Sequence, residues 1–153
     1  MSELESPLHK TRRRLPHWSL DGSVYFVTFR LASGVLSETE RTVVLDHIRR
    51  GDGRFYRLFG VVVMPDHVHL VFKPVGEHDL SRIMKGTKGM TARLINQSRG
   101  TVGQVWQDES WDRILRDEPK YLRVMQYLAD NPAELGLCRA DERYDWLYLN
   151  LES

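Results

Sequence analysis

Three segments of the chain are rich in β-branched and aromatic residues and are bounded by turn residues, as strands are. These segments are 23–31 (SVYFVTFRL), 57–64 (RLFGVVVM) and 67–74 (HVHLVFKP). Pro65 and Asp66 separate the last two by a tight turn, which predicts a β-hairpin. We expect a short fourth strand at 103–107 (GQVWQ), close to the segment WDRIL.

Two helices are expected between these strands, and both have N-terminal signals. Ser37 and Glu40 form a capping box at the start of SETERTVVLDHIRRGDG, a segment that ends in glycines. Asp79 can cap the segment 79–98, in which apolar residues recur at helical spacing beside basic ones. Two internal glycines weaken this second helix.

A third helix is predicted at 118–131, with Asp117 as its cap, Pro119 in its first turn and Asn131-Pro132 at its end. The element order is then β-α-β-β-α-β followed by an extra helix, which is the ferredoxin-like pattern. The predicted fold is α+β, with two helices on one face of the sheet and an additional C-terminal helix that bears a tyrosine. We divide the chain into a basic N-terminal arm, 1–16, and a single domain, 17–153.

Composition limits the cellular setting. With 153 residues and one cysteine, Cys138, the chain can form one proper core and no intramolecular disulfide, which fits a reducing cytosol. The start of the sequence has no apolar stretch typical of a signal peptide, and the apolar runs are too short to span a membrane. We expect a soluble cytoplasmic protein without a membrane partner.

The net charge of +1 gives no indication of a nucleic-acid partner, but the distribution of charge does. The segment KTRRR is a basic cluster at 10–14, and residues 81–99 carry five Lys and Arg with no acidic residue. This segregation suits a phosphate-binding surface, although solvated helix faces and a solubilising tail would look the same. The candidate nucleic-acid contacts are Arg12, Arg13, Arg14, Arg82, Lys85, Lys88, Arg93, Arg113, Arg116 and Lys120. Of these, Arg113 and Arg116 could instead pair with neighbouring aspartates.

His67 and His69 stand two residues apart in a strongly apolar strand. Residues i and i+2 of a strand point to the same side, so the two imidazoles project together. Val68, Leu70 and Phe72 project to the other side and are candidates for packing on the helices. The histidines would then lie on the open face of the sheet, a few ångströms apart, where they could chelate one cation. On spacing alone, a pair of surface histidines or one satisfied core histidine is the favoured interpretation.

The last predicted helix adds a second group of polar side chains. Its apolar stripe, which should face the sheet, consists of Tyr121, Val124, Met125 and Leu128. At ~100° per residue, Tyr127 lies roughly 110° from the centre of this stripe, and Asn131 falls on the same flank, as does Lys120. The alternative is a tyrosine at the edge of the core and an asparagine that ends the helix.

These side chains indicate a chemistry, but their spacing in the sequence does not show that they form one site. A phenol is protonated at neutral pH and is then a poor nucleophile. A divalent cation on a target phosphate would neutralise charge and orient the phosphate for in-line attack. Two imidazoles and an amide oxygen leave room for water and phosphate oxygens in a six-coordinate site for Mg²⁺ or Mn²⁺, with the imidazoles favouring Mn²⁺.

Several motifs of the chain resemble those of the HUH single-tyrosine transposases, and in particular the REP-associated tyrosine transposases, which act on hairpins of repetitive extragenic palindromes in bacteria. The motifs are RRRLPHW with YFVTFRL, VVMPDHVHL, GQVWQDESWDRILRDE and YLADNPAELGL, and they extend through nearly the whole chain. Two small departures are Asp66, where the family commonly has Asn, and NPAELGL in place of NPVxAGL.

The resemblance implies the βαββαβ fold and roles for four residues. His67 and His69 match the metal ligands, Asn131 matches a third ligand position, and Tyr127 matches the nucleophile that attacks a phosphate of single-stranded DNA. The products in such enzymes are a 5′-phosphotyrosine link and a free 3′-hydroxyl, so rejoining needs no ATP. The implied cofactor is Mg²⁺ or Mn²⁺, the partner is single-stranded or hairpin DNA, and the enzyme is a nucleoid-associated monomer or homodimer.

Two other functions are compatible with parts of the pattern. The first is a catalytically inactive regulator that binds nucleic-acid hairpins on the same fold. The second is a zinc hydrolase that uses the H-x-H pair, but the chain is short for the usual barrel and lacks an evident third strong zinc ligand. Trp106 and Trp111 could stack on unpaired bases or belong to the core.

Overall fold

The computed structural model of the chain describes residues 22–150, so the predicted basic arm with Arg12, Arg13 and Arg14 lies outside the described residues. The elements follow one another as β1 (Val24–Arg30), α2 (Glu38–Arg50), β2 (Tyr56–Val63), β3 (His67–Pro74), α3 (Leu80–Arg99), β4 (Trp111–Leu115), α4 (Glu118–Glu134) and β5 (Leu147–Leu149). The βαββαβ order with a further helix is confirmed. No helix within 22–150 is both long enough and apolar enough to cross a membrane.

The strands form one sheet in the order β4-β1-β3-β2-β5, in which every neighbouring pair is antiparallel. The predicted β2–β3 hairpin is confirmed, and the Met64 amide donates to the His67 carbonyl across its turn (2.8 Å). β3 therefore lies in the middle of the sheet, between β1 and β2. This position holds the backbone of the two candidate metal ligands by ladders on both sides.

The fourth strand is not where the sequence pattern placed it. Segment 103–107 contributes only an isolated bridge between Trp106 and Leu31, and the strand that pairs with β1 is Trp111–Leu115. The prediction at 103–107 was wrong because Trp106 is turned into the core, where its indole N–H donates to the Thr91 hydroxyl (2.9 Å). The short strand β5 was not among the predicted elements.

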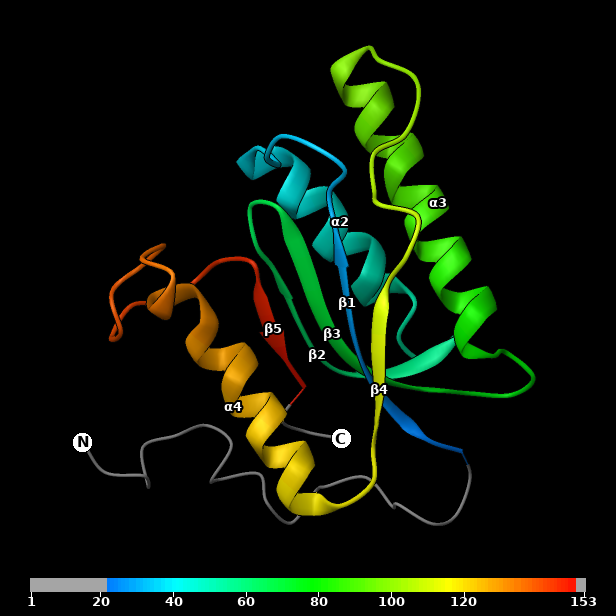
Figure 1. The fold of residues 1–153 in the computed structure, drawn as a ribbon, viewed down its shortest axis with the longest axis vertical. Coiled ribbons are helices and arrows are strands. Elements are labelled where there is room, and N and C mark those ends of the chain that lie inside the picture. Colours follow the sequence, from blue (N-terminus) through cyan, green and yellow to red (C-terminus); the bar gives the residue numbers. More distant parts are fainter. Residues whose placement is uncertain (1–21, 151–153) are drawn as a thin grey trace.

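Helices cover both faces of the sheet (Figure 1). α2 and α3 pack on the face that carries Val68, Leu70 and Phe72, as predicted. α4 packs on the other face through its predicted apolar stripe, against a cluster that includes Phe59 and Val71. The face expected to be open is thus covered by α4.

A glycine sets how closely α4 approaches the sheet. A Cβ on Gly60 of β2 would lie only 3.0 Å from the methyl group of Met125 in α4. The bare backbone at this position lets α4 rest directly on β2. α4 also continues to Glu134, beyond the predicted end at Asn131-Pro132. Pro132 has no amide hydrogen to donate, but helical hydrogen bonding resumes after it, where the Leu135 amide donates to the Asn131 carbonyl (3.1 Å).

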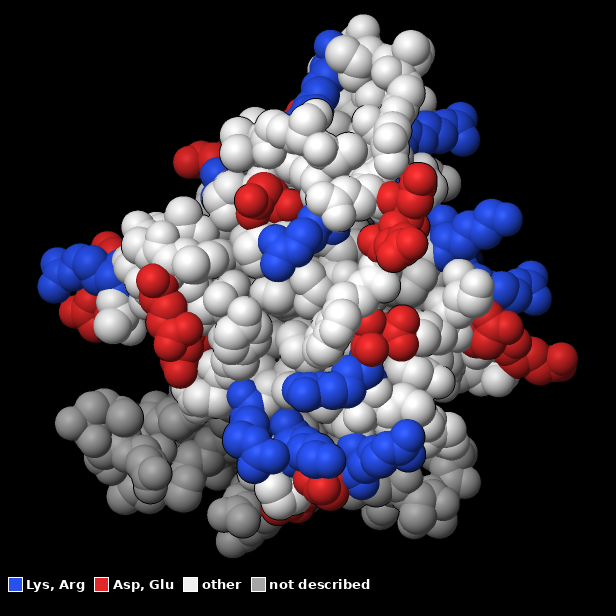
Figure 2. All heavy atoms as spheres, in the orientation of Figure 1, with Lys and Arg blue, Asp and Glu red and all other residues white. Residues whose placement is uncertain are grey.

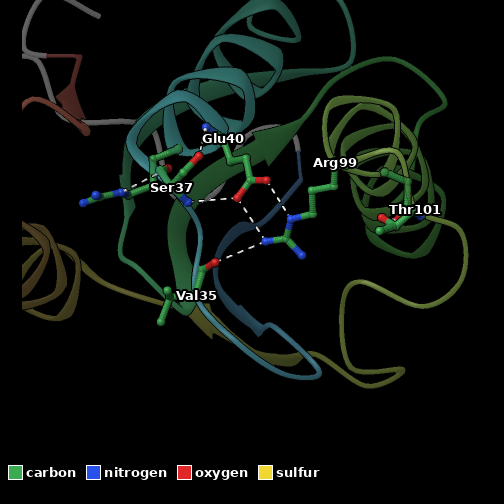
Figure 3. Close-up of polar contacts among 7 residues, drawn as sticks. Val35, Ser37, Glu40, Arg99 and Thr101 are labelled. Atoms are coloured by element: carbon green, nitrogen blue, oxygen red, sulfur yellow. Dashed lines mark hydrogen bonds and ion pairs between the residues drawn. The ribbon is translucent and has the colours of Figure 1, made fainter.

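An ion pair ties α2 to the end of α3 (Figure 3). The predicted capping box is present, and Glu40 accepts from the Ser37 amide (2.9 Å) while its own amide donates to the Ser37 hydroxyl (3.1 Å). The same carboxylate accepts two hydrogen bonds from Arg99, at 2.6 and 3.0 Å. Arg99 also donates to the Val35 carbonyl (3.1 Å). One carboxylate therefore joins the β1–α2 connection, α2 and α3.

Glu40→Gln is expected to lower the free energy of unfolding at pH 7 by roughly 1–2 kcal/mol, because the amide cannot form the ion pair with Arg99. The loss is limited because solvent partly screens the Arg99 guanidinium. The hydrogen bonds from Arg99 are the main reason that the pKa of Glu40 lies below its usual 4.5. The ionised carboxylate thus stabilises the fold above pH 4.5, and this contribution is lost as the pH falls through the lowered pKa. Denaturant unfolding of both proteins should show the difference at pH 7 shrinking below pH 4.5.

The exposed Glu38, in the same first turn of α2, provides the control. Glu38→Gln should change the free energy of unfolding by no more than about 0.5 kcal/mol at either pH. An equal loss in both variants would mean that charge at the helix N-terminus, rather than the pair with Arg99, accounts for the effect.

Candidate active site

The two histidines of β3 lie side by side, as predicted, with ring centroids 4.7 Å apart. They are not on an open face: His67 is 7% exposed and His69 is 4% exposed. Their burial follows from α4, which covers this side of the sheet. The pair is more enclosed than strand alternation alone indicated.

Each imidazole is held through its Nδ1 atom. Nδ1 of His67 lies 2.7 Å from a carboxylate oxygen of Asp66, and Nδ1 of His69 lies 2.7 Å from the hydroxyl of Thr28. Thr28 is the partner of His69 across the β1–β3 ladder. When Nδ1 carries the proton and donates it to these oxygens, the lone pair on Nε2 is free to bind a metal.

His69 is uncharged at neutral pH. Burial lowers the pKa of His69 to about 3, with smaller contributions from the nearby His67 and Arg30. A neutral imidazole is the form that ligates a metal, so no proton has to be displaced from His69.

Asn131 also differs from its predicted position. It was expected on the exposed flank of the helix with Tyr127, but it is 4% exposed and belongs to the buried face of α4. Because α4 runs opposite to β3 (Figure 1), the turn from Tyr127 to Asn131 advances in the direction from His69 towards His67. Asn131 is therefore displaced from Tyr127 in the same direction as His67 is displaced from His69.

The residues present fit a divalent cation. Among residues 22–150, the buried side-chain polar atoms without a hydrogen-bond partner are Nε2 of His69 and Oδ1 of Asn131. Burying such atoms unpaired is costly, and both are atoms that ligate metals. Within the same range no group of three or more His, Cys, Asp or Glu is arranged to hold a metal. A site here would use the two imidazoles and the Asn131 amide.

Tyr127 is next to the histidines and accessible. Its ring centroid is 5.3 Å from that of His69 and 6.3 Å from that of Phe26, and the residue is 43% exposed. It lines an open cleft of about 760 Å³ between β1, β4 and α4. The predicted nucleophile and one predicted metal ligand thus share one solvent-accessible cleft.

Cations surround this cleft. Arg30, Arg113 and Arg123 line it together with one acid, Glu109. Arg116 and Lys120 are exposed in the turn after β4 and the start of α4, where Lys and Arg gather in Figure 2. Of the predicted contacts, Arg113 lines the cleft, and Arg116 and Lys120 lie in the connection from β4 to α4 and in the first turn of α4. Arg30 and Arg123 were missed, since only the packing of α4 on the sheet brings them together.

The predicted contacts on α3 lie elsewhere. α3 covers the opposite face of the sheet, so Arg82, Lys85 and Arg93 do not line the cleft of Tyr127. The Lys88 ammonium donates to the carbonyls of Gln107 and Asp108 and to the hydroxyl of Ser110, which ties α3 to the chain before β4. Burial lowers the pKa of Lys88. This lysine has a structural role.

Arg82 lines a second pocket, of about 440 Å³, between α2 and α3. Arg50 and Arg54 line it as well, and neither was among the predicted contacts. No acidic residue is part of its lining. The chain therefore has a basic pocket on each side of the sheet.

The two tryptophans of the GQVWQDESW segment have different surroundings. Trp106 is buried with its ring 4.7 Å from that of Phe29, so it belongs to the core. Trp111 is exposed at the rim of the cleft that contains Tyr127. Of the two, Trp111 is the one that lines the cleft of Tyr127.

Thr28→Val is expected to weaken binding of Mn²⁺ by about 10- to 100-fold, the usual cost of losing a hydrogen bond that supports a metal ligand. Valine has nearly the shape of threonine but cannot accept the proton on Nδ1 of His69. Isothermal titration of the protein with MnCl₂ measures the change. Thr42→Val, at an exposed threonine of α2, is the control and should leave the affinity unchanged. Equal affinities of wild type and Thr28→Val would show that this hydrogen bond does not support a ligand.

Comparison with known proteins gives two kinds of match. Residues 40–115, about half of the chain, match the family model described as "Transposase IS200 like". This segment extends from α2 to β4 and includes His67 and His69, whereas Tyr127 and Asn131 lie beyond it. No curated protein sequence matches the chain.

The fold is similar to that of solved structures. A REP-associated tyrosine transposase bound to a REP hairpin superposes with a TM-score of 0.66 at 19% identity, over 87% of this chain and 80% of that one. A protein from Deinococcus radiodurans R1 described as a candidate transposase superposes with a TM-score of 0.52 at 20% identity, over 76% of this chain and 95% of that one. At these identities the likeness shows a common fold.

Proposed function

Since the chain belongs to the IS200-like transposase family through its residues 40–115, we propose that it is a metal-dependent enzyme that nicks and rejoins single-stranded DNA with Tyr127 as its nucleophile. The observation that carries this proposal is the accessible phenol of Tyr127, whose ring centroid lies 5.3 Å from that of His69 in a cleft lined by arginines. The unpartnered ligand atoms of His69 and Asn131 support a metal site beside it.

The chemical step exchanges one phosphodiester for another. The phenol oxygen of Tyr127 bonds to the phosphorus, the bond from phosphorus to the 3′-oxygen breaks, and the phenol proton is balanced by the proton that the leaving 3′-oxygen takes up. The DNA 5′-phosphate is then linked to the tyrosine, and a 3′-hydroxyl can reverse the reaction. A divalent ion held by His67, His69 and Asn131 would supply charge neutralisation at the phosphate oxygens.

The protein's own residues position the strand. Arg30, Arg113 and Arg123 provide guanidinium groups for the phosphates that flank the reacting one. The packing of α4 on the sheet fixes Tyr127 next to His69 within a single chain. We infer that a monomer can assemble the whole site, so the tyrosine acts with its own chain's metal ligands.

We further propose that the DNA is a hairpin with an unpaired flank, of the repetitive extragenic palindrome type. The similar solved structure is bound to a REP hairpin. The second basic pocket, with Arg50, Arg54 and Arg82, gives the chain a phosphate-binding surface apart from the cleft. A hairpin stem and its single-stranded flank could therefore contact different sides of the molecule.

The test is incubation of the protein with hairpin DNA labelled at its 3′ end, with Mn²⁺ or Mg²⁺, followed by a denaturing gel. We expect a labelled protein–DNA adduct that forms only on single-stranded flanks and is abolished by EDTA. Binding of the hairpin without any adduct, with either metal, would instead support the inactive hairpin-binding regulator. Fully duplex DNA of the same sequence is the control and should give no adduct.

A further inference from the structure

Trp111 has an unusual environment for the largest apolar side chain. It is 52% exposed, whereas Trp106 is buried and Trp146 is covered by Arg41, whose guanidinium lies 4.1 Å from its ring. A single exposed apolar side chain is common on soluble domains, so the neighbours of Trp111, rather than its exposure alone, indicate its role. Trp111 is the first residue of β4, an edge strand, so no neighbouring strand covers its outer side.

The ring is nevertheless held in place. It meets Phe26 edge-on, with centroids 5.4 Å apart and planes at 83°. The guanidinium of Arg113, two residues along the same side of β4, lies 5.6 Å from the Trp111 ring and 5.9 Å from the Phe26 ring. Trp111 is therefore a rigid aromatic surface with a cation beside it, which is the combination that binds unpaired bases and their phosphates.

Phe26 connects this surface to the candidate active site. Its ring lies 5.4 Å from Trp111, 5.7 Å from His69 and 6.3 Å from Tyr127. All four residues line the same cleft. A phosphate beside Tyr127 and a base stacked on Trp111 can therefore belong to neighbouring nucleotides of one strand.

Resting on the proposed function, we propose that Trp111 is the stacking platform for an unpaired base next to the phosphate attacked by Tyr127, with Arg113 contacting the intervening backbone. A base can stack on Trp111 only when it is unpaired, so this contact selects single-stranded DNA over duplex at the cleavage point. Stacking is tolerant of base identity, so the platform selects strandedness rather than sequence.

The test is a binding cycle that does not depend on cleavage. Hairpins with a single-stranded flank carry an abasic nucleotide at each flank position in turn, and their dissociation constants are measured for the wild type and Trp111→Ala in EDTA. At one position the abasic substitution should weaken binding to the wild type by about 10- to 100-fold. Trp111→Ala should bind the intact flank equally weakly and show no further loss at that position.

Three variants identify the cause. Trp111→Phe keeps an aromatic ring and should restore most of the abasic penalty, and Trp146→Phe should behave as the wild type. A thermal melt of Trp111→Ala should stay close to that of the wild type, because the side chain is half exposed.

The proposal is overturned if the abasic penalty at every position is the same in wild type and Trp111→Ala. This outcome is distinct from a failure of the proposed function, which would appear as normal stacking without a covalent adduct.

Discussion

Tyr127→Phe is expected to abolish the covalent protein–DNA adduct and to lower strand cleavage by roughly a thousandfold or more, the usual result of removing a covalent nucleophile. The substitution deletes only the phenol oxygen. The ring that packs beside His69 and Phe26 remains, so the cleft keeps its shape. Hairpin binding should change by no more than a few-fold, because the arginines of the cleft are untouched. The denaturing gel and a binding titration measure the two effects separately.

Tyr25 provides the matched control. It lies on β1 on the opposite face of the sheet, where its ring packs near Phe72. Tyr25→Phe should form the adduct at the wild-type rate. If Tyr127→Phe still forms an adduct that survives denaturation, another residue is the nucleophile and the assignment of Tyr127 fails.

His69→Ala is expected to weaken Mn²⁺ binding by roughly a hundredfold or more, since even the loss of a supporting hydrogen bond costs about 10- to 100-fold. The substitution removes one of the two buried atoms that have no partner within residues 22–150. It should also abolish adduct formation, because charge on the attacked phosphate is no longer neutralised. Calorimetric titration with MnCl₂ and the adduct gel are the measurements.

The half-buried His78, which lines the pocket on the other side of the sheet, is the histidine control. His78→Ala should bind Mn²⁺ as the wild type does. Circular dichroism of His69→Ala must show a folded protein before the titration is interpreted. Unchanged Mn²⁺ affinity in folded His69→Ala would show that β3 does not bind the metal.

Strand and helix periodicities in the sequence predicted most of the fold and half of the candidate site. The alternation of β3 placed His67 and His69 on one side and Val68, Leu70 and Phe72 on the other, and both assignments hold. The caps Ser37, Asp79 and Asp117 start their helices as predicted. These features depend on neighbours in the sequence, which is why a single sequence reveals them.

The errors arose where long-range packing decides the structure. Asn131 looked like a flank residue that ends a helix, but α4 continues past Pro132 and buries it against the sheet. The fourth strand was placed too early because the apolar residues of GQVWQ serve the core beside α3 rather than a ladder. Thr28 was missed because only the register of β1 on β3 brings it to His69, from 41 residues away.

The two halves of the site are anchored in different ways. β3 is hydrogen-bonded to β1 on one side and to β2 on the other, so exposing the amides around His67 and His69 requires the sheet itself to open. α4 packs on the sheet through side chains and is not a member of the strand ladders, and local opening of such a unit costs less free energy. Amide hydrogen exchange should therefore be slower in β3 than in α4. DNA linked to Tyr127 would be attached to the element that detaches more easily, while the two histidine ligands stay in the most persistent part of the fold.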